Sequence, residues 1–131
     1  MPGTGGVQLA PALLTLTLLL AITPRGAAAQ ADHSWTTAHV ALASAASLSI
    51  LIDWSQTRQA MGQGWAEKNP ILGTHPSSGR LALYNMLAIG GTVGIGALLP
   101  QRWRTVWFGS VIGLEAYTIA GNASLGLHIG F

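Results

Sequence analysis

The sequence predicts an all-α integral membrane protein, a bundle of three transmembrane helices after an N-terminal signal peptide. Only 8% of its 131 residues are charged, whereas a typical soluble domain has about 25% and uses them to cover its surface. Half of the residues are hydrophobic, which excludes a disordered chain. Apolar runs at 35–53, 81–99 and 105–122 each have the roughly 20 residues that a helix needs to cross about 30 Å of hydrocarbon.

Charge and cysteine content exclude several classes of function. The pI of about 9.7 rests on six Lys and Arg against four Asp and Glu, so it marks no basic patch and no nucleic-acid partner. The absence of cysteine excludes disulfides, thiolate catalysis and cysteine-ligated metals. We expect the lipid bilayer as the main partner, with other membrane subunits or a second copy of the chain beside it, and no cofactor.

The first element, residues 1–31, is expected to be the signal peptide. Its apolar stretch 7–22 is followed by Ala29-Gln30-Ala31, an A-x-A pattern that predicts cleavage there. The residues before the apolar stretch lack the Lys or Arg that normally precedes a signal sequence. An uncleaved first transmembrane helix, which would make four helices, therefore stays open, and 32–131 is the helical membrane domain in either case.

Each of the three spans carries one stripe of small or polar side chains. Side chains three and four residues apart share a helix face, and polar groups avoid lipid, so the three stripes are expected to face one another. The stripes are His39, Ala43, Ala46, Ile50 and Asp53 in the first span, Asn85, Ala88, Thr92 and Gly96 in the second, and Glu115, Thr118 and Asn122 in the third.

Two pairs of glycines, Gly90 with Gly94 and Gly109 with Gly113, lie in the second and third spans. Small residues at this spacing let helix backbones approach closely where lipid gives no hydrophobic drive for association. We expect both pairs to pack inside this bundle, and a dimer face is the alternative.

The connections between the spans are predicted at 54–80 and 100–104. In the longer one, 55–66 can form a short amphipathic helix at the interface before an Asn-Pro turn ends it. The shorter one is expected to be a tight turn in which water reaches Arg104. Each side of the membrane would carry three cations, so the orientation of 54–80 stays open.

A polar layer is predicted where the spans meet the long loop. Asp53 ends the first span, Asn85 lies about one turn inside the second, and Asn122, about 27 Å along the third, returns to the same level. The loop side adds further polar side chains to this layer, namely Gln56, Thr57, Glu67 and Asn69. We interpret the cluster either as a structural lock for the loop or as a ligand or ion site.

Glu115 is expected apart from this layer, near the bilayer midplane, where a carboxylate must be protonated or paired. No motif for catalysis accompanies these residues, because the chain has no phosphate-binding glycine loop, no H-E-x-x-H and no G-x-S-x-G. The spacing of Asp53, Glu67 and His75 matches no recognised metal site. We therefore predict no catalytic residue and no metal.

The segment around this layer resembles the signature of an uncharacterised family of small bacterial multi-pass membrane proteins. Residues 53–57 read D-x-x-Q-T and residues 67–73 read E-x-N-P-x-L-G, followed by a Pro-Ser that leads into the next span. The resemblance implies a helical bundle in the bacterial inner (cytoplasmic) membrane and carries no activity. Its matching positions are Asp53, Gln56, Thr57, Glu67, Asn69 and Pro70.

We expect a protein without evident catalytic activity, an accessory or scaffold component of the membrane whose polar layer holds the loop 54–80. The first alternative is an oligomeric transporter or an ion- or proton-conducting subunit that uses Glu115 and Asp53, with His39 at the opposite mouth. The second is a membrane enzyme that acts on lipid-linked substrates with Asp53 and Glu67 as acid and base.

Overall fold

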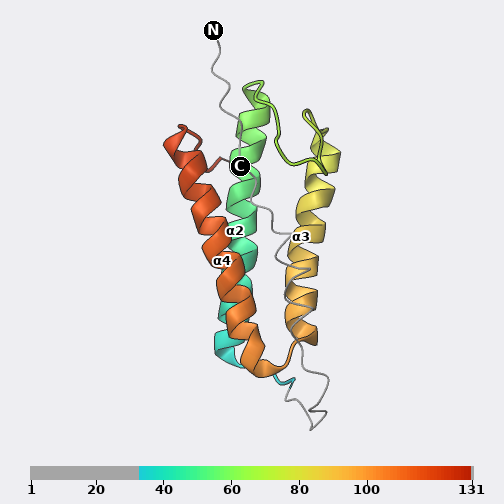
Figure 1. The fold of residues 1–131 in the computed structure, drawn as a ribbon, viewed down its shortest axis with the longest axis vertical. Helices are drawn as coiled ribbons and strands as arrows, with labels where there is room; N and C mark the ends of the chain where they lie inside the picture. The colour runs from blue at the N-terminus through green and yellow to red at the C-terminus, as the bar shows by residue number, and fades with distance from the viewer. Residues whose placement is uncertain (1–32, 131) are drawn as a thin grey trace.

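A computed structural model describes residues 33–130 as three α-helices without a strand. The helices are α2 (Thr37–Gly62), α3 (Ser78–Leu98) and α4 (Gln101–Ser124). They lie side by side along one long axis, with the 63–77 loop at one end, here called the loop end, and the short α3–α4 connection at the other, the turn end (Figure 1). The all-α prediction is confirmed for this part of the chain, and the predicted signal peptide or first helix at 1–31 lies outside it.

Local sequence signals set the helix starts. Thr36 caps α2 by accepting a hydrogen bond from the His39 backbone N–H at 3.2 Å, and the His39 ring bonds back to the Thr36 backbone in a capping box. The Ser77 hydroxyl caps α3 by accepting from the Arg80 backbone N–H at 3.2 Å. Pro100 precedes α4, where its fixed φ and missing N–H suit the first turn of a helix.

Both predicted connections differ from the observed ones. The α2 helix continues through Asp53 to Gly62, so the separate interfacial helix predicted at 55–66 is wrong. No Pro or Gly interrupts this stretch before Gly62, and Ser55, Gln56 and Thr57 are buried against the rest of the bundle instead of marking the end of the helix. The connection between the last two helices is a tight turn, but it lies at 99–100 instead of the predicted 100–104, because α4 begins at Gln101.

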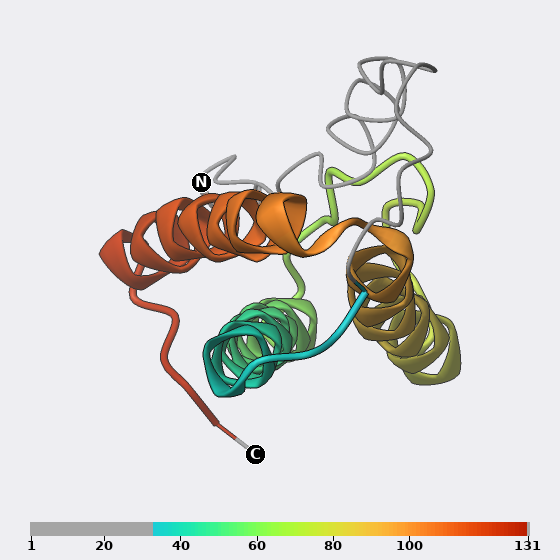
Figure 2. The ribbon, with the colours of Figure 1, turned by 90° about the horizontal axis from the view of Figure 1, so that it is seen from below.

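The three helices pack with their predicted stripes inward. Both α3 and α4 contact α2 far more than they contact each other, and the view along the bundle shows their triangular arrangement (Figure 2). The whole predicted stripe of α2 is buried, as is that of α4, while in α3 only Ala88 of the four is partly exposed. The apolar core lies toward the turn end, where Ala43, Ala46, Trp107 and Phe108 meet.

Glycine packing differs from the expectation. A Cβ on Gly96 would lie 2.3 Å from Cζ of Phe108, so this glycine is what lets α3 and α4 approach at the turn end. A Cβ on any glycine of the two predicted pairs would meet no atom within 4 Å. Internal packing of those pairs is therefore wrong within the described residues, and the glycines Gly90, Gly94, Gly109 and Gly113 are exposed.

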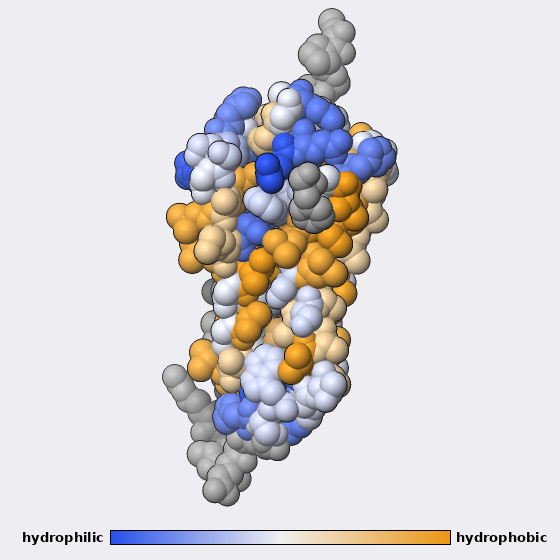
Figure 3. Space-filling view, turned by 180° about the vertical axis from the view of Figure 1, so that it is seen from behind, coloured by the Kyte–Doolittle hydropathy of each residue, from blue (hydrophilic) through white to orange (hydrophobic). Residues whose placement is uncertain are grey.

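Two of the described helices are long and apolar enough to cross a membrane. They are α2, with a mean hydropathy of 1.3 over its best stretch, and α3, with 1.6. Only 22% of each of these stretches is buried within the bundle, so most of their residues keep some surface that is not covered by the described residues. Figure 3 shows apolar side chains gathered around the middle of the molecule and hydrophilic ones at its two ends. The third span stays a prediction.

Candidate functional site

The polar layer at the loop end joins α2 to α4 by side-chain hydrogen bonds. Nδ2 of Asn122 donates to Oδ1 of Asp53 at 3.0 Å, and both side chains are buried. One turn further along α2, Nε2 of Gln56 donates to the Ile119 carbonyl at 3.4 Å. Each bond satisfies a polar group that would otherwise be buried without a partner, which is unfavourable by about 1–3 kcal/mol.

Three carboxylates converge on this layer. Asp53 interacts electrostatically with both Glu115 and Glu67, so both glutamates lie within electrostatic range of this layer. All three side chains are buried. Within residues 33–130, no cation pairs with any of them, although a buried charge ordinarily has such a partner. The three acids therefore form an excess of acid that the cations of the described residues do not neutralise.

The loop that covers the layer is built from the residues of the E-x-N-P-x-L-G segment. Oε1 of Glu67 accepts hydrogen bonds from the backbone N–H groups of Lys68 and Asn69, both at 2.8 Å. Oδ1 of Asn69 accepts from the Ile71 N–H at 3.0 Å, which is an Asx turn. Leu72 is 1% exposed, and Gly73 has a φ of +77° that disfavours any other residue. Each of these positions thus has a role in holding the loop in shape.

The same loop is tied to α3. The Tyr84 hydroxyl interacts electrostatically with the Asn69 side chain, and Nη2 of Arg80 donates to the Ile71 carbonyl at 2.8 Å. Burial raises the pKa of the Glu67 carboxyl, while its two backbone N–H donors act in the opposite direction. The protonated form of Glu67 is therefore favoured relative to a glutamate in water.

Several buried polar atoms at the loop end have no hydrogen-bond partner within the described residues. They are Trp54 Nε1, Gln56 Oε1, Thr57 Oγ1 and Glu67 Oε2. Among residues 33–130, no three acidic or histidine side chains are arranged to hold a metal ion. The unpartnered atoms accordingly accompany an acidic cluster and not a set of metal ligands.

Arg104, at the turn end, is a buried cation, and the expectation that water reaches it is wrong. Its side chain is 0% exposed, and its guanidinium lies 4.8 Å from the Trp35 ring centre. It donates to the carbonyls of Gly96 at 2.8 Å and Ala97 at 3.2 Å. Two more bonds go to the carbonyls of His33 and Ser34, which precede α2.

One signal in the sequence points to this role for Arg104. The last four carbonyls of a helix have no partner inside the helix, and α3 ends just before Pro100, close to where α4 begins. An arginine in the first turn of α4 is the nearest side chain with enough donors to reach them. The contact with His33 and Ser34 could not be read from spacing, because it joins segments about 70 residues apart.

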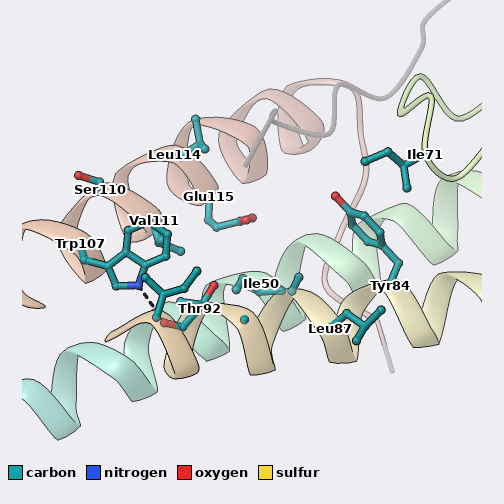
Figure 4. A pocket seen from close by; sticks show the side chains of 13 residues that line it. Ile50, Ile71, Tyr84, Leu87, Thr92, Trp107, Ser110, Val111, Leu114 and Glu115 are labelled. Carbon is teal, nitrogen blue, oxygen red and sulfur yellow. Dashed lines mark hydrogen bonds between the residues drawn. The ribbon is translucent and has the colours of Figure 1, made fainter. Parts of the chain in front are cut away.

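A cavity of about 410 Å³ lies between the facing sides of α3 and α4. Figure 4 shows Glu115 and Tyr84 reaching into it from opposite helices, with Trp107 toward the turn end. Nε1 of Trp107 donates to the Thr92 carbonyl at 2.8 Å, which fixes the indole against α3. Apart from Glu115, Tyr84, Thr92, Trp107 and Ser110, the described wall residues carry only hydrocarbon or no side chain.

The structure buries all the sequence-derived site residues except Asn69, which is partly exposed. The buried ones are Asp53, Gln56, Thr57, Glu67, Asn85, Asn122 and Glu115. His39, proposed for the opposite mouth of a pathway, serves in the α2 cap. The chain matches no protein family, no curated protein and no solved structure.

Proposed function

We propose that this protein is a multi-pass integral membrane protein of the bacterial inner membrane, an accessory or scaffold component without catalytic activity. In this proposal α2, α3 and α4 all span the bilayer, and the polar layer holds the 63–77 loop in a fixed shape for contact with a partner. The observation that carries it is the Glu67 carboxylate, whose hydrogen bonds go to the backbone of its own loop. The signature around Asp53 and Glu67 agrees with this proposal.

The outer surface supports the membrane part of the proposal. Large apolar side chains project outward from α2 and α3, and a soluble protein would hide most of them. At 1.5 Å per residue, the helices extend over about 39, 32 and 36 Å, and each is longer than a hydrocarbon core of about 30 Å. Among these exposed residues are Val40, Leu48, Leu83, Met86, Leu87 and Leu98.

The less apolar helix α4 is included because both of its ends are fixed to the other two. Arg104 bonds to the carbonyls of the last turn of α3 at the turn end. Asn122 bonds to Asp53 of α2 at the loop end. Because α4 is attached to α3 at the turn end and to α2 at the loop end, we expect it to span the bilayer together with them.

Extraction from membranes tests the spanning helices. We expect full-length protein produced in bacteria to stay in the membrane pellet after washing with alkaline carbonate and to dissolve only in detergent. Release by carbonate alone would contradict a multi-pass protein and leave at most a peripheral one.

Limited proteolysis tests the loop. Glu67→Ala removes the acceptor of two backbone N–H groups, so we expect trypsin to cleave after the exposed Lys68 several-fold faster than in the wild type. Glu67→Gln keeps an acceptor oxygen and is the matched control. Equal cleavage rates for wild type and Glu67→Ala would overturn the idea that this carboxylate holds the loop.

A conducting subunit is the second candidate, and the convergence of Asp53, Glu67 and Glu115 favours it. The three described helices are too few to enclose a pathway by themselves, so this candidate requires an oligomer. A proton flux in liposomes that Glu115→Gln abolishes would select this candidate, whereas background flux for both proteins would remove it.

A further inference from the structure

We propose that the cavity between α3 and α4 binds a lipophilic organic cation, an amine or onium ion with apolar substituents, with the Glu115 carboxylate as its counter-ion. The site goes beyond the proposed accessory role, because holding the 63–77 loop requires no ligand. A cavity of about 410 Å³ falls within the range of about 300–1,000 Å³ that small-molecule sites occupy.

The walls select an apolar ligand. Side chains from all three helices and the loop contribute hydrocarbon, with α3 and α4 providing most of the surface. Gly91 and Ala88 leave room on the α3 side, and a Cβ on Gly91 would meet no atom within 4 Å. The apolar part of the wall is formed mainly by Ile50, Ile71, Leu87, Ile95, Val111 and Leu114.

The charge of the cavity selects a cation. Glu115 is 7% exposed, lines the cavity and, within residues 33–130, receives no hydrogen bond and forms no ion pair. The described wall residues include no Lys, Arg or His. Asp53 lies near enough to interact electrostatically with both Glu67 and Glu115. A charged carboxylate without a counter-ion in an apolar site is strongly unfavourable, and either a proton or a cationic ligand offsets that penalty.

Two aromatic side chains add to this preference. Tyr84 and Trp107 both line the cavity, and Tyr84 interacts electrostatically with Glu115. Figure 4 shows Glu115 between them along the cavity. The faces of tyrosine and tryptophan rings attract cations, more strongly where water is excluded. Carboxylate, aromatic faces and hydrocarbon walls together describe a site for a cation with a large apolar surface.

Binding of two ions of equal shape and opposite charge tests the proposal. The full-length protein is placed in nanodiscs of a neutral lipid and titrated in a calorimeter with tetraphenylphosphonium or with tetraphenylborate. We expect saturable binding of the cation, with the protein-free nanodisc as the baseline. For the anion we expect affinity weaker by about tenfold or more. Absence of saturable cation binding, or equal affinity for both ions, would overturn the proposal.

Cavity variants locate the binding. Gly91→Leu places a side chain into the cavity without a backbone clash, whereas Gly90→Leu makes the same change on the neighbouring residue, which does not line it. We expect about a tenfold or greater loss of cation affinity in the first variant and little change in the second. Equal affinities in the two variants would place the ion elsewhere and overturn the site.

Glu115→Gln tests the counter-ion with nearly unchanged shape. Because the carboxylate receives no hydrogen bond from residues 33–130, we expect the variant to fold, as checked by far-UV circular dichroism, and to lose about tenfold in cation affinity. Ser110→Leu, which also fills the cavity, gives an independent test if Gly91→Leu fails to fold. Retained affinity in Glu115→Gln would exclude this carboxylate as the counter-ion. These binding results do not depend on carbonate extraction or on cleavage of the loop.

Discussion

The turn end and the loop end of the bundle bury charge in opposite ways. At the turn end, Arg104 directs its donors to four backbone carbonyls and stacks on Trp35. Toward the loop end, Asp53 lies within electrostatic range of both Glu67 and Glu115, and no cation of residues 33–130 neutralises these acids. The first arrangement leaves every nitrogen of the Arg104 guanidinium with a partner, and the second leaves acceptor atoms without partners.

This difference separates a structural role from a binding role. A buried cation whose nitrogens all bond to the backbone stabilises one packing arrangement. A set of buried acids lowers the stability of the folded state unless something else supplies positive charge or protons. We therefore assign stability to the turn end and ligand or partner contact to the loop end, and three predictions compare what each end contributes to stability.

The largest effect is expected at the turn end from Arg104→Met. Hydrogen bonds to charged groups contribute about 1.5–3 kcal/mol each, and several are lost together, so we expect the free energy of unfolding to fall by about 3 kcal/mol or more. Unfolding in sodium dodecyl sulfate, followed by circular dichroism, measures it. Arg102→Met, at an exposed position of the same helix turn, should change stability by less than about 0.5 kcal/mol. Equal losses in both variants would remove the special role of Arg104.

An intermediate effect is expected from Gly96→Ala, also at the turn end. The new methyl group would overlap Phe108, so we expect a loss of about 1–3 kcal/mol in the same unfolding measurement. Gly94→Ala has open space around it and should change stability by no more than about 1 kcal/mol. Phe108→Leu should recover part of the loss in the Gly96→Ala background. A similar loss in both glycine variants would show that the close approach at Gly96 is unimportant.

The smallest effect is expected at the loop end, in the pH dependence of stability through Glu67. Because burial raises its pKa, the folded protein holds this proton more firmly than the unfolded chain does. The wild type therefore loses stability relative to Glu67→Gln as the pH rises through the ordinary glutamate range, until the raised pKa is passed. The free energy of unfolding of both proteins is measured between about pH 4 and about pH 8, and the difference between the two is taken at each pH. Groups that titrate in the same way in both proteins cancel in this difference. A difference that changes in the opposite direction would mean that the two N–H donors outweigh burial.

The helix faces could be predicted from the sequence because they depend only on the helical period and on the chemistry of single residues. His39, Ala46 and Asp53 fall on one side of a helix at their spacing, and all three are buried in α2. The juxtaposition of Asp53 and Asn122 at the loop end followed from the rise per residue and is present as a hydrogen bond.

Helix ends and contacts between distant segments could not be predicted in this way. Ser55 and Thr57 look like the exit from a membrane span by polarity alone, but polarity does not end a helix and both are buried inside α2. The burial of Arg104 depends on where the chain before α2 passes. The cavity beside Glu115 depends on how α3 and α4 sit on α2, which the sequence pattern does not encode.

The bonds from α2 to α4 also have a consequence for the order in which the chain is made. Asp53 and Gln56 are synthesised 69 and 63 residues before the groups that bond to them. During synthesis, the helix with the polar stripe thus exists before its partners, and in a membrane it would have to wait beside the insertion machinery or enter lipid with those groups unsatisfied. Assembly of this small bundle is therefore tied to the arrival of its last helix.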